Sequence, residues 1–122
     1  MPGDDAEMEV FIEPEWGIRA LVSVLLNYQR KHGLRTVEGM IRRWCPPTHT
    51  FPDGRKIGQN TAGYVRFVAQ QVGVPADAQI DAMRPDVMRP LVKAIIQKEN
   101  GQQPYTDAQI DEGMRRAGLK LG

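Results

Sequence analysis

The side chains best suited to covalent chemistry are few in this sequence. It contains a single cysteine, Cys45, and one of its two histidines, His49, follows four residues later. That spacing brings side chains together on a helix, but Pro46 and Pro47 prevent a continuous helix between them. A Cys–His dyad would also need a third group to orient the histidine. Cys45 is therefore interpreted as a small, half-buried apolar residue beside Trp44.

Metal and serine chemistry are also poorly supported. The cysteine and the two histidines offer at most three nitrogen or sulfur ligands, and no pair has the spacing of a zinc site. His32 is interpreted as a cation at the C-terminal end of a helix. Ser23 is the only serine and lies within a helical pattern, not on a sharp nucleophile turn. The sequence has no Gly-rich phosphate loop, and we predict no metal and no cofactor.

Carboxylates remain as candidate catalytic groups, because a glycosidase needs only one or two placed acids. The residues considered are Glu15, Glu38, Asp53 and Glu99. Glu99 ends an apolar helical pattern, and an apolar setting can raise the pKa of a glutamate so that it acts as a general acid. The alternative for Glu99 is a solvated helix-end residue, and Asp53 fits an ordinary turn position. Glu99 and Glu15 are kept as candidate catalytic residues.

Basic and aromatic residues are interleaved in the middle of the chain, a composition that suits an anionic partner. A solvated charged face explains the same pattern, and the net charge of +1 gives no global attraction to nucleic acid or membrane. Residues that fall off the apolar stripes are the better surface candidates. The predicted partner-binding set is Arg42, Phe51, Arg55, Arg66 and Phe67.

Length and composition indicate one globular domain. The chain has 122 residues, of which 41% are apolar and 25% charged, as in ordinary soluble proteins. The longest apolar run, 20–26, is far too short to span a bilayer. The acidic start "MPGDDAEMEV" argues against a signal peptide, and a single cysteine excludes an internal disulfide.

Five apolar patterns with helical spacing predict a mainly α-helical fold. "TDAQ" at 106–109 predicts a capping box, and Pro90 is expected in the first turn of its helix, where its missing N–H costs least. The expected helices are Pro14 to His32, a second that follows the N-cap Thr36 and ends before Pro46, a third from about Asn60 or Thr61 to Gly73, a fourth over about Val87 to Asn100, and a fifth that follows Thr106 and ends near Gly118.

The remaining segments complete the domain plan. Residues 1–9 are acidic with few apolar side chains and are predicted to be flexible. Residues 10–122 form the single helical domain, with a short extended piece at 10–12. Between 48 and 57 the "PDG" turn predicts a small β-hairpin, which would be marginal unless it packs on the helices.

An ordered set of short motifs runs through the chain. The motifs are "GIRA" at 17–20, Leu-x-Thr-Val at 34–37, Arg-Trp-x-Pro-Pro at 43–47, Thr-x-x-Tyr at 61–64, Ile-Ile-x-x-Glu-Asn-Gly at 95–101, and Pro-Tyr at 104–105. Together they resemble a family of tailed-phage and prophage proteins that are usually described as virion structural proteins of undefined role. The resemblance covers roughly residues 10–115 and implies a phage-derived origin without an established mechanism.

The chain departs from the family pattern in two places. Family members commonly carry an upstream segment rich in Gly, Asn, Pro and Arg, and this chain starts at what resembles the tail of that segment. The family also passes from the Pro-Pro corner to the Thr-x-x-Tyr helix in a few residues, whereas "HTFPDGRKIGQ" intervenes here. We predict that residues 48–58 are an insertion that contacts a partner and whose deletion leaves the fold intact.

The resemblance implies a virion-associated structural or accessory protein of phage or prophage origin, which acts through protein–protein contacts with other virion proteins. Such a protein would lie in the bacterial cytoplasm when expressed from a prophage, and in the virion when assembled. A weaker likeness to lysozyme-like proteins gives the alternative, a muramidase or transglycosylase acting on peptidoglycan with Glu99 or Glu15 as general acid. Nucleic-acid binding would need one continuous basic face and is disfavoured.

Overall fold

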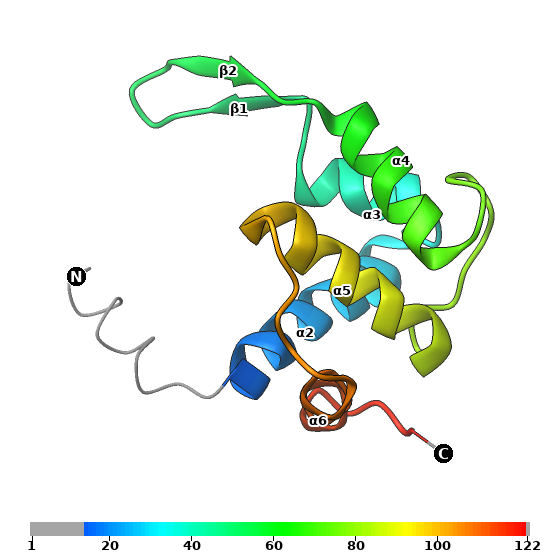
Figure 1. Ribbon diagram of the computed structural model, residues 1–122. Coiled ribbons are helices and arrows are strands. Elements are labelled where there is room, and N and C mark those ends of the chain that lie inside the picture. Colours follow the sequence, from blue (N-terminus) through cyan, green and yellow to red (C-terminus); the bar gives the residue numbers. More distant parts are fainter. Residues whose placement is uncertain (1–13, 122) are drawn as a thin grey trace.

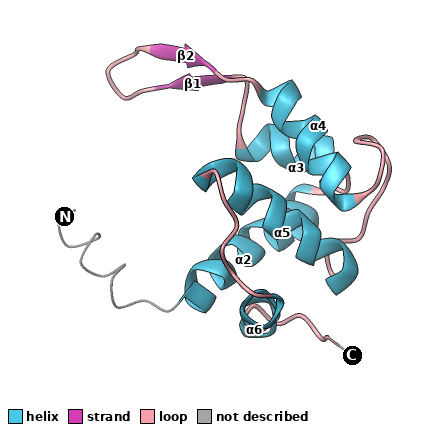
Figure 2. Cartoon of the chain, viewed as in Figure 1, coloured by secondary structure: helices cyan, strands magenta, loops and turns pink. Residues whose placement is uncertain are grey.

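The computed structural model describes residues 14–121, which form a mainly α-helical domain, as predicted. The helices surround one core, and a small hairpin projects from them (Figures 1 and 2). In chain order the elements are α2 (Pro14–His32), α3 (Val37–Trp44), β1 (Thr48–Thr50), β2 (Lys56–Gly58), α4 (Thr61–Val72), α5 (Pro85–Asn100) and α6 (Asp107–Arg116). The flexibility predicted for residues 1–9 and the extended piece at 10–12 lie outside the described residues.

Local capping signals set most of the helix boundaries. Thr36 caps α3 and Asn60 caps α4, each by accepting a hydrogen bond from a backbone N–H in the first turn. Thr106 and Gln109 form the predicted capping box at the start of α6. Gly73 ends α4 with a φ of 85°, a left-handed conformation that favours glycine. These boundaries agree with the sequence predictions.

The start of α5 differs from its prediction. The helix begins at Pro85 rather than near Val87, because a proline at the first position has a suitable φ and lacks an N–H that would be unpaired there. Pro90 consequently lies inside the helix, beyond the first turn that was predicted for it. The backbone carbonyl of Asp86 therefore lacks its intrahelical hydrogen bond, because Pro90 has no N–H to donate.

The core is formed by the inward faces of the five helices of residues 14–121. The apolar stripes expected from the sequence face the core, with most of their residues buried and the others half-buried against it. Residues three or four apart share a helix face. Burying the side chain of a valine, leucine or isoleucine stabilises the fold by roughly 1.5–3 kcal/mol relative to leaving it exposed. Fully buried examples, one from each helix, are Leu25, Ile41, Val68, Leu91 and Ile110.

Helices α2 and α6 approach each other closely at Gly113. A Cβ atom at this position would lie 2.3 Å from Cγ2 of Ile18, so the approach requires a glycine. A polar contact adds to the same interface, because Nε of Arg19 donates a hydrogen bond of 3.2 Å to the carbonyl of Arg116. The pairing of α2 with α6 therefore depends on one small residue.

A buried glutamine fixes the long connection between α4 and α5. Gln29 is 5% exposed, and its Oε1 accepts a hydrogen bond of 2.7 Å from the N–H of Ala82. Its Nε2 donates to the Asp81 carboxylate at 2.9 Å. The N–H of Ile80 donates to the carbonyl of Arg35 at 2.7 Å. Because the amide of Gln29 and the buried N–H groups of Ile80 and Ala82 are paired, the connection is held against the end of α2 and the start of α3.

Candidate functional site

The hairpin arm, residues 48–58, extends away from the helical body (Figure 1). β1 and β2 are antiparallel, with Thr48 opposite Gly58 and Thr50 opposite Lys56. All three residues of β2 are exposed, and Ile57 retains 50% of its accessible surface. The predicted hairpin is confirmed, but its second strand lies open to solvent instead of packing on the helices.

The turn of the arm is specified by local contacts. The N–H of Gly54 donates to the carbonyl of Phe51 at 2.9 Å, and the N–H of Phe51 donates to the carbonyl of Arg55 at 2.7 Å. Gly54 has a φ of 91°, which residues with a Cβ rarely adopt. Hydrogen bonds from the backbone N–H and then the guanidinium of Arg55 lower the pKa of Asp53. The same guanidinium lies 4.7 Å from the centroid of the Phe51 ring.

The base of the arm is tied to the ends of α3 and α4. The backbone N–H of Gln59 donates to the carbonyl of Pro47 at 2.8 Å, and its side-chain amide donates to the carbonyl of Pro46 at 2.6 Å. The hydroxyl of Thr61, which is 3% exposed, donates to the carbonyl of Cys45 at 2.6 Å. The thiol of Cys45 donates to Oε1 of Gln59 at 3.5 Å. The arm therefore leaves the body from a fixed base.

Cys45 is half-buried at the C-terminal end of α3, as the apolar interpretation predicted. Among residues 14–121, no three or more His, Cys, Asp or Glu side chains are grouped so that they could hold a metal. The helices in this range include none with the length and apolar character needed to cross a membrane.

Glu99 ends a chain of three hydrogen-bonding side chains where α3, α4 and α5 meet. Nε1 of Trp44 donates to the hydroxyl of Tyr64 at 3.1 Å, and that hydroxyl donates to Oε2 of Glu99 at 2.8 Å. Tyr64 is only 5% exposed. Burial, followed by the hydrogen bond to Glu99, raises the pKa of Tyr64 far above its ordinary value. The tyrosine is thus a neutral donor at any physiological pH.

The two candidate catalytic residues have different settings. Glu99 is exposed at the end of α5 and accepts the hydrogen bond from Tyr64, while Glu15 is half-buried in the first turn of α2. An exposed carboxylate at a helix end lacks the apolar enclosure expected of a general acid. A catalytic role for Glu99 or Glu15 stays a prediction.

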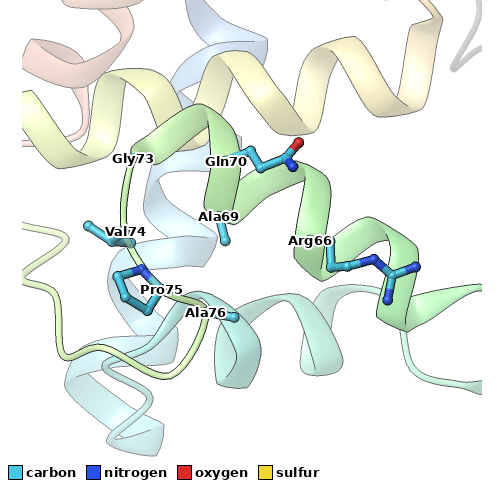
Figure 3. A pocket seen from close by; sticks show the side chains of 7 residues that line it. All are labelled: Arg66, Ala69, Gln70, Gly73, Val74, Pro75 and Ala76. Carbon is cyan, nitrogen blue, oxygen red and sulfur yellow. The ribbon is translucent and has the colours of Figure 1, made fainter.

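Among the hollows formed by residues 14–121, three lie near α4 and α5, and neither Glu99 nor Glu15 lines any of these three. The Arg66 hollow has a volume of about 340 Å³ and is shown in Figure 3; its lining residues are Arg66, Ala69, Gln70, Gly73, Val74, Pro75 and Ala76. A second, of about 430 Å³, includes Arg35, Val74, Ile80 and Arg84. A third, of about 200 Å³, includes Phe67, Lys93, Gln97 and Gln103.

The predicted partner-binding residues fall on three elements. Phe51 and Arg55 contact each other on the arm. Arg42 forms an ion pair within α3. Arg66 is exposed on α4, whereas the neighbouring Phe67 is half-buried against the core. The structure brings Phe51 and Arg55 together. The other three lie on the helices, Arg42 on α3 and Arg66 and Phe67 on α4. Whether any of the five binds a partner stays a prediction.

One surface aromatic was missed by the sequence reasoning. Trp16 is 48% exposed, with the guanidinium of Arg116 at 4.6 Å from its ring centroid and that of Arg19 at 5.7 Å. Its position off the apolar stripe of α2 was the available signal. The predicted partner-binding residues come from the interleaved basic and aromatic residues in the middle of the chain, and Trp16 lies outside that stretch.

Comparison with known proteins relates this chain to a phage protein. The chain is similar to Protein P5 of Pseudoalteromonas phage PM2, to which it is 36% identical over 110 residues. The match covers 89% of this chain and 61% of Protein P5, so the chain spans about three fifths of the length of the curated relative. No family model matches the chain. The relationship supports a phage protein, as the sequence motifs predicted, while membership of the particular virion protein family that they resemble stays a prediction.

Proposed function

We propose that the chain is a virion-associated structural or accessory protein of phage or prophage origin, which acts through contacts with other virion proteins. It would be made in the bacterial cytoplasm when expressed from a prophage and would enter the virion on assembly. Similarity to a phage protein over 110 residues supports the origin. The observation that carries the role in protein contacts is the projecting hairpin arm.

The exposure of the arm suits a surface that contacts another protein better than an element that stabilises the helical body. Its strand residues Thr48, Thr50, Lys56 and Ile57 are all exposed. A hairpin of two strands is marginal in water on its own. Here the turn is closed by hydrogen bonds, and Gln59 and its neighbours fix the base. These contacts hold the arm in shape from its turn and from its base.

Two properties of the arm suit a protein partner. The sheet has only two strands, so each strand keeps one edge that can pair with an extended segment of another protein. Ile57 is an exposed apolar residue, and covering it would remove apolar surface from water. Arg55 and Lys56 add positive charge beside it.

The proposal is tested by asking whether the protein is part of assembled particles. Particles from the phage or induced prophage that encodes the chain are purified on a density gradient, and the chain is quantified by mass spectrometry. Wild type should sediment with the particles at a constant copy number. A variant with residues 48–58 replaced by Asn-Gly should be folded but depleted from them. A variant with Lys120→Glu, an exposed cation outside the arm, serves as the control.

Two results would count against the proposal. Wild-type protein that is abundant in the lysate but missing from purified particles would overturn virion association. Equal incorporation of the wild type and the shortened variant would overturn the assignment of the contact to the arm.

The alternative, a peptidoglycan-cleaving enzyme, has less support from the geometry of Glu99. Its carboxylate is exposed and adjoins none of the three hollows described above. We expect no clearing of a purified cell-wall suspension by wild type, Glu99→Gln or Glu15→Gln. Clearing by the wild type that either substitution abolishes would establish the enzyme instead.

A further inference from the structure

The charges of this chain are divided unevenly along the sequence. Residues 1–13 contain five carboxylates and no lysine or arginine. All 16 Lys and Arg residues lie further along, with the other 10 acids, so residues 14–122 carry a formal charge of +6 against −5 for residues 1–13. A strongly acidic segment and a basic body attract each other, within one molecule or between two.

Arg66 is an exposed cation that offers a place for such a segment. Arg42, Arg84 and Arg89 each form an ion pair with a nearby carboxylate. Within residues 14–121, no carboxylate lies at ion-pair distance from Arg66. An exposed guanidinium without a protein partner can accept a carboxylate in the two-bond geometry that arginine favours.

The surface beside Arg66 is apolar and concave. Figure 3 shows Ala69 of α4 facing the segment that contains Pro75 and Ala76, with Arg66 further along the helix. The volume of about 340 Å³ is near the lower limit of ligand pockets, about 300–1,000 Å³, so it suits one or two side chains. Asp77 follows Ala76 and is exposed, so a negative charge lies beside the Ala76 side of the hollow. The positive charge is therefore confined to the Arg66 side. The hollow therefore fits an apolar side chain with a carboxylate next to it.

Residues 7–13 have that composition. In "EMEVFIE", Met8 lies between two glutamates, and Val10, Phe11 and Ile12 lie between Glu9 and Glu13. We propose that residues 1–13 of one copy dock on the Arg66 hollow of a second copy, with an apolar side chain in the hollow and a carboxylate on Arg66.

The position of the hollow favours a contact between two copies. Residue 14 begins α2, which is 19 residues long and therefore about 28 Å from end to end. Residues 7–13 can reach at most about 25 Å from residue 14 when fully extended, so within one copy they fall short of the far end of α2. The Ala76 side of the hollow lies near the other end of α2, because the carbonyl of Ala76 accepts a hydrogen bond of 3.0 Å from the N–H of Glu38 in the first turn of α3. Docking between copies is thus head-to-tail, an arrangement that forms rings or open chains.

Such a small contact should give weak, salt-sensitive association. This inference does not depend on virion association, because it concerns the purified protein alone.

Sedimentation velocity of the full chain is measured over a range of protein concentrations. The hollow variant is Arg66→Glu, with Arg66→Gln as a milder form. The segment variant replaces the acids at 4, 5, 7, 9 and 13 by their amides. The matched control is Lys120→Glu.

We expect the wild type to self-associate, less so at high salt. Each variant should weaken self-association about tenfold or more, which corresponds to about 1.4 kcal/mol, while the control leaves it unchanged. Mixing the hollow and segment variants should restore association between unlike chains, because one supplies an intact segment and the other an intact hollow. Circular dichroism checks that each variant is folded.

Three outcomes would overturn the inference. A wild type that stays monomeric at every concentration would exclude the contact between copies. Self-association that neither variant changes would place the interface elsewhere on the molecule. Variants that weaken association but show no recovery on mixing would exclude the pairing of this segment with this hollow between two copies.

Discussion

The hydroxyl of Tyr64 donates a hydrogen bond of 2.8 Å to Glu99, which joins the first turn of α4 to the end of α5. The same hydroxyl accepts a hydrogen bond from the indole of Trp44 at 3.1 Å, so α3 is joined as well. Glu99 is exposed, whereas Tyr64 is almost fully buried. This arrangement gives the Glu99 carboxylate a structural role as the outermost acceptor of a three-helix junction.

Replacing Tyr64 by phenylalanine should destabilise the fold. The substitution keeps the ring but leaves the Trp44 N–H and the Glu99 carboxylate without their shared partner. We expect a loss of about 1–2 kcal/mol in the free energy of unfolding, measured by urea denaturation. Tyr105→Phe is the matched control, because Tyr105 is half-buried and its hydrogen bonds with Gln103 use its backbone N–H and carbonyl. Equal stability of Tyr64→Phe and wild type would show that the hydroxyl contributes nothing.

Truncating Gln29 should loosen the connection between α4 and α5. Gln29→Ala removes two hydrogen bonds, to Ala82 and Asp81, from a site that is 5% exposed. The N–H of Ala82 would then be left without its acceptor, and we expect a cost of about 2–3 kcal/mol. Limited proteolysis should also cut within residues 73–84 faster than in wild type. Gln70→Ala, at an exposed position, should change neither measurement.

Asp81 should contribute to the acid sensitivity of the fold. The hydrogen bond from Gln29, followed by one from the backbone N–H of Met83, lowers the pKa of Asp81 below its ordinary 3.8. A lowered pKa in the folded state means that the contribution to stability is complete above the unfolded-state pKa and is lost as pH falls through the folded-state value. The stability difference between wild type and Asp81→Asn should therefore shrink between about pH 5 and pH 2. Urea denaturation at several pH values measures it, and parallel curves for the two proteins would contradict the assignment.

The pentapeptide Asp-Ala-Gln-Ile-Asp shows what local sequence can and cannot predict. It occurs at 77–81 in a loop and at 107–111 in α6. The second copy follows Thr106, whose side chain caps the helix, so its structure was predictable from neighbouring residues. The first copy follows Pro75 and Ala76, and its Asp81 bonds to Gln29, 52 residues away. A contact at that separation leaves no signal in a local pattern.

The candidate site was predictable to the same limited extent. The turn chemistry around Gly54 predicted the hairpin, and the spacing of Phe51 and Arg55 across that turn explains why they meet. Arg66 is exposed, as its position off the apolar stripe predicted, but Phe67 is half-buried because it packs against the core from outside the stripe. The bond between Tyr64 and Glu99 joins residues 35 apart and depends on how α4 and α5 pack.

Two glycine substitutions should change stability in opposite directions. Gly113→Ala would place a Cβ 2.3 Å from Cγ2 of Ile18, and overpacking of this kind costs about 1–3 kcal/mol, more than the helix propensity gained. Gly17→Ala has no atom within 4 Å of the new Cβ and should stabilise α2 by about 0.5–1 kcal/mol. Thermal unfolding of the two variants measures the contrast. A stabilised Gly113→Ala protein would mean that α2 and α6 can move apart without loss.

Shortening the arm should leave the helical body folded. The N–H of Gln59 donates to the carbonyl of Pro47 at 2.8 Å, so Asn-Gly in place of residues 48–58 keeps this bond as the closing bond of a two-residue turn. The strand residues Thr48, Thr50, Lys56 and Ile57 are exposed. The shorter connection favours folding by on the order of 1 kcal/mol. Urea denaturation should therefore give a stability equal to or slightly above that of wild type. Thr61→Ala, which removes the buried hydroxyl from the carbonyl of Cys45, should instead cost about 1 kcal/mol. If the shortened protein lost several kcal/mol, the arm would have to stabilise the body, and its exposed strands could not then be interpreted as a surface kept for a partner.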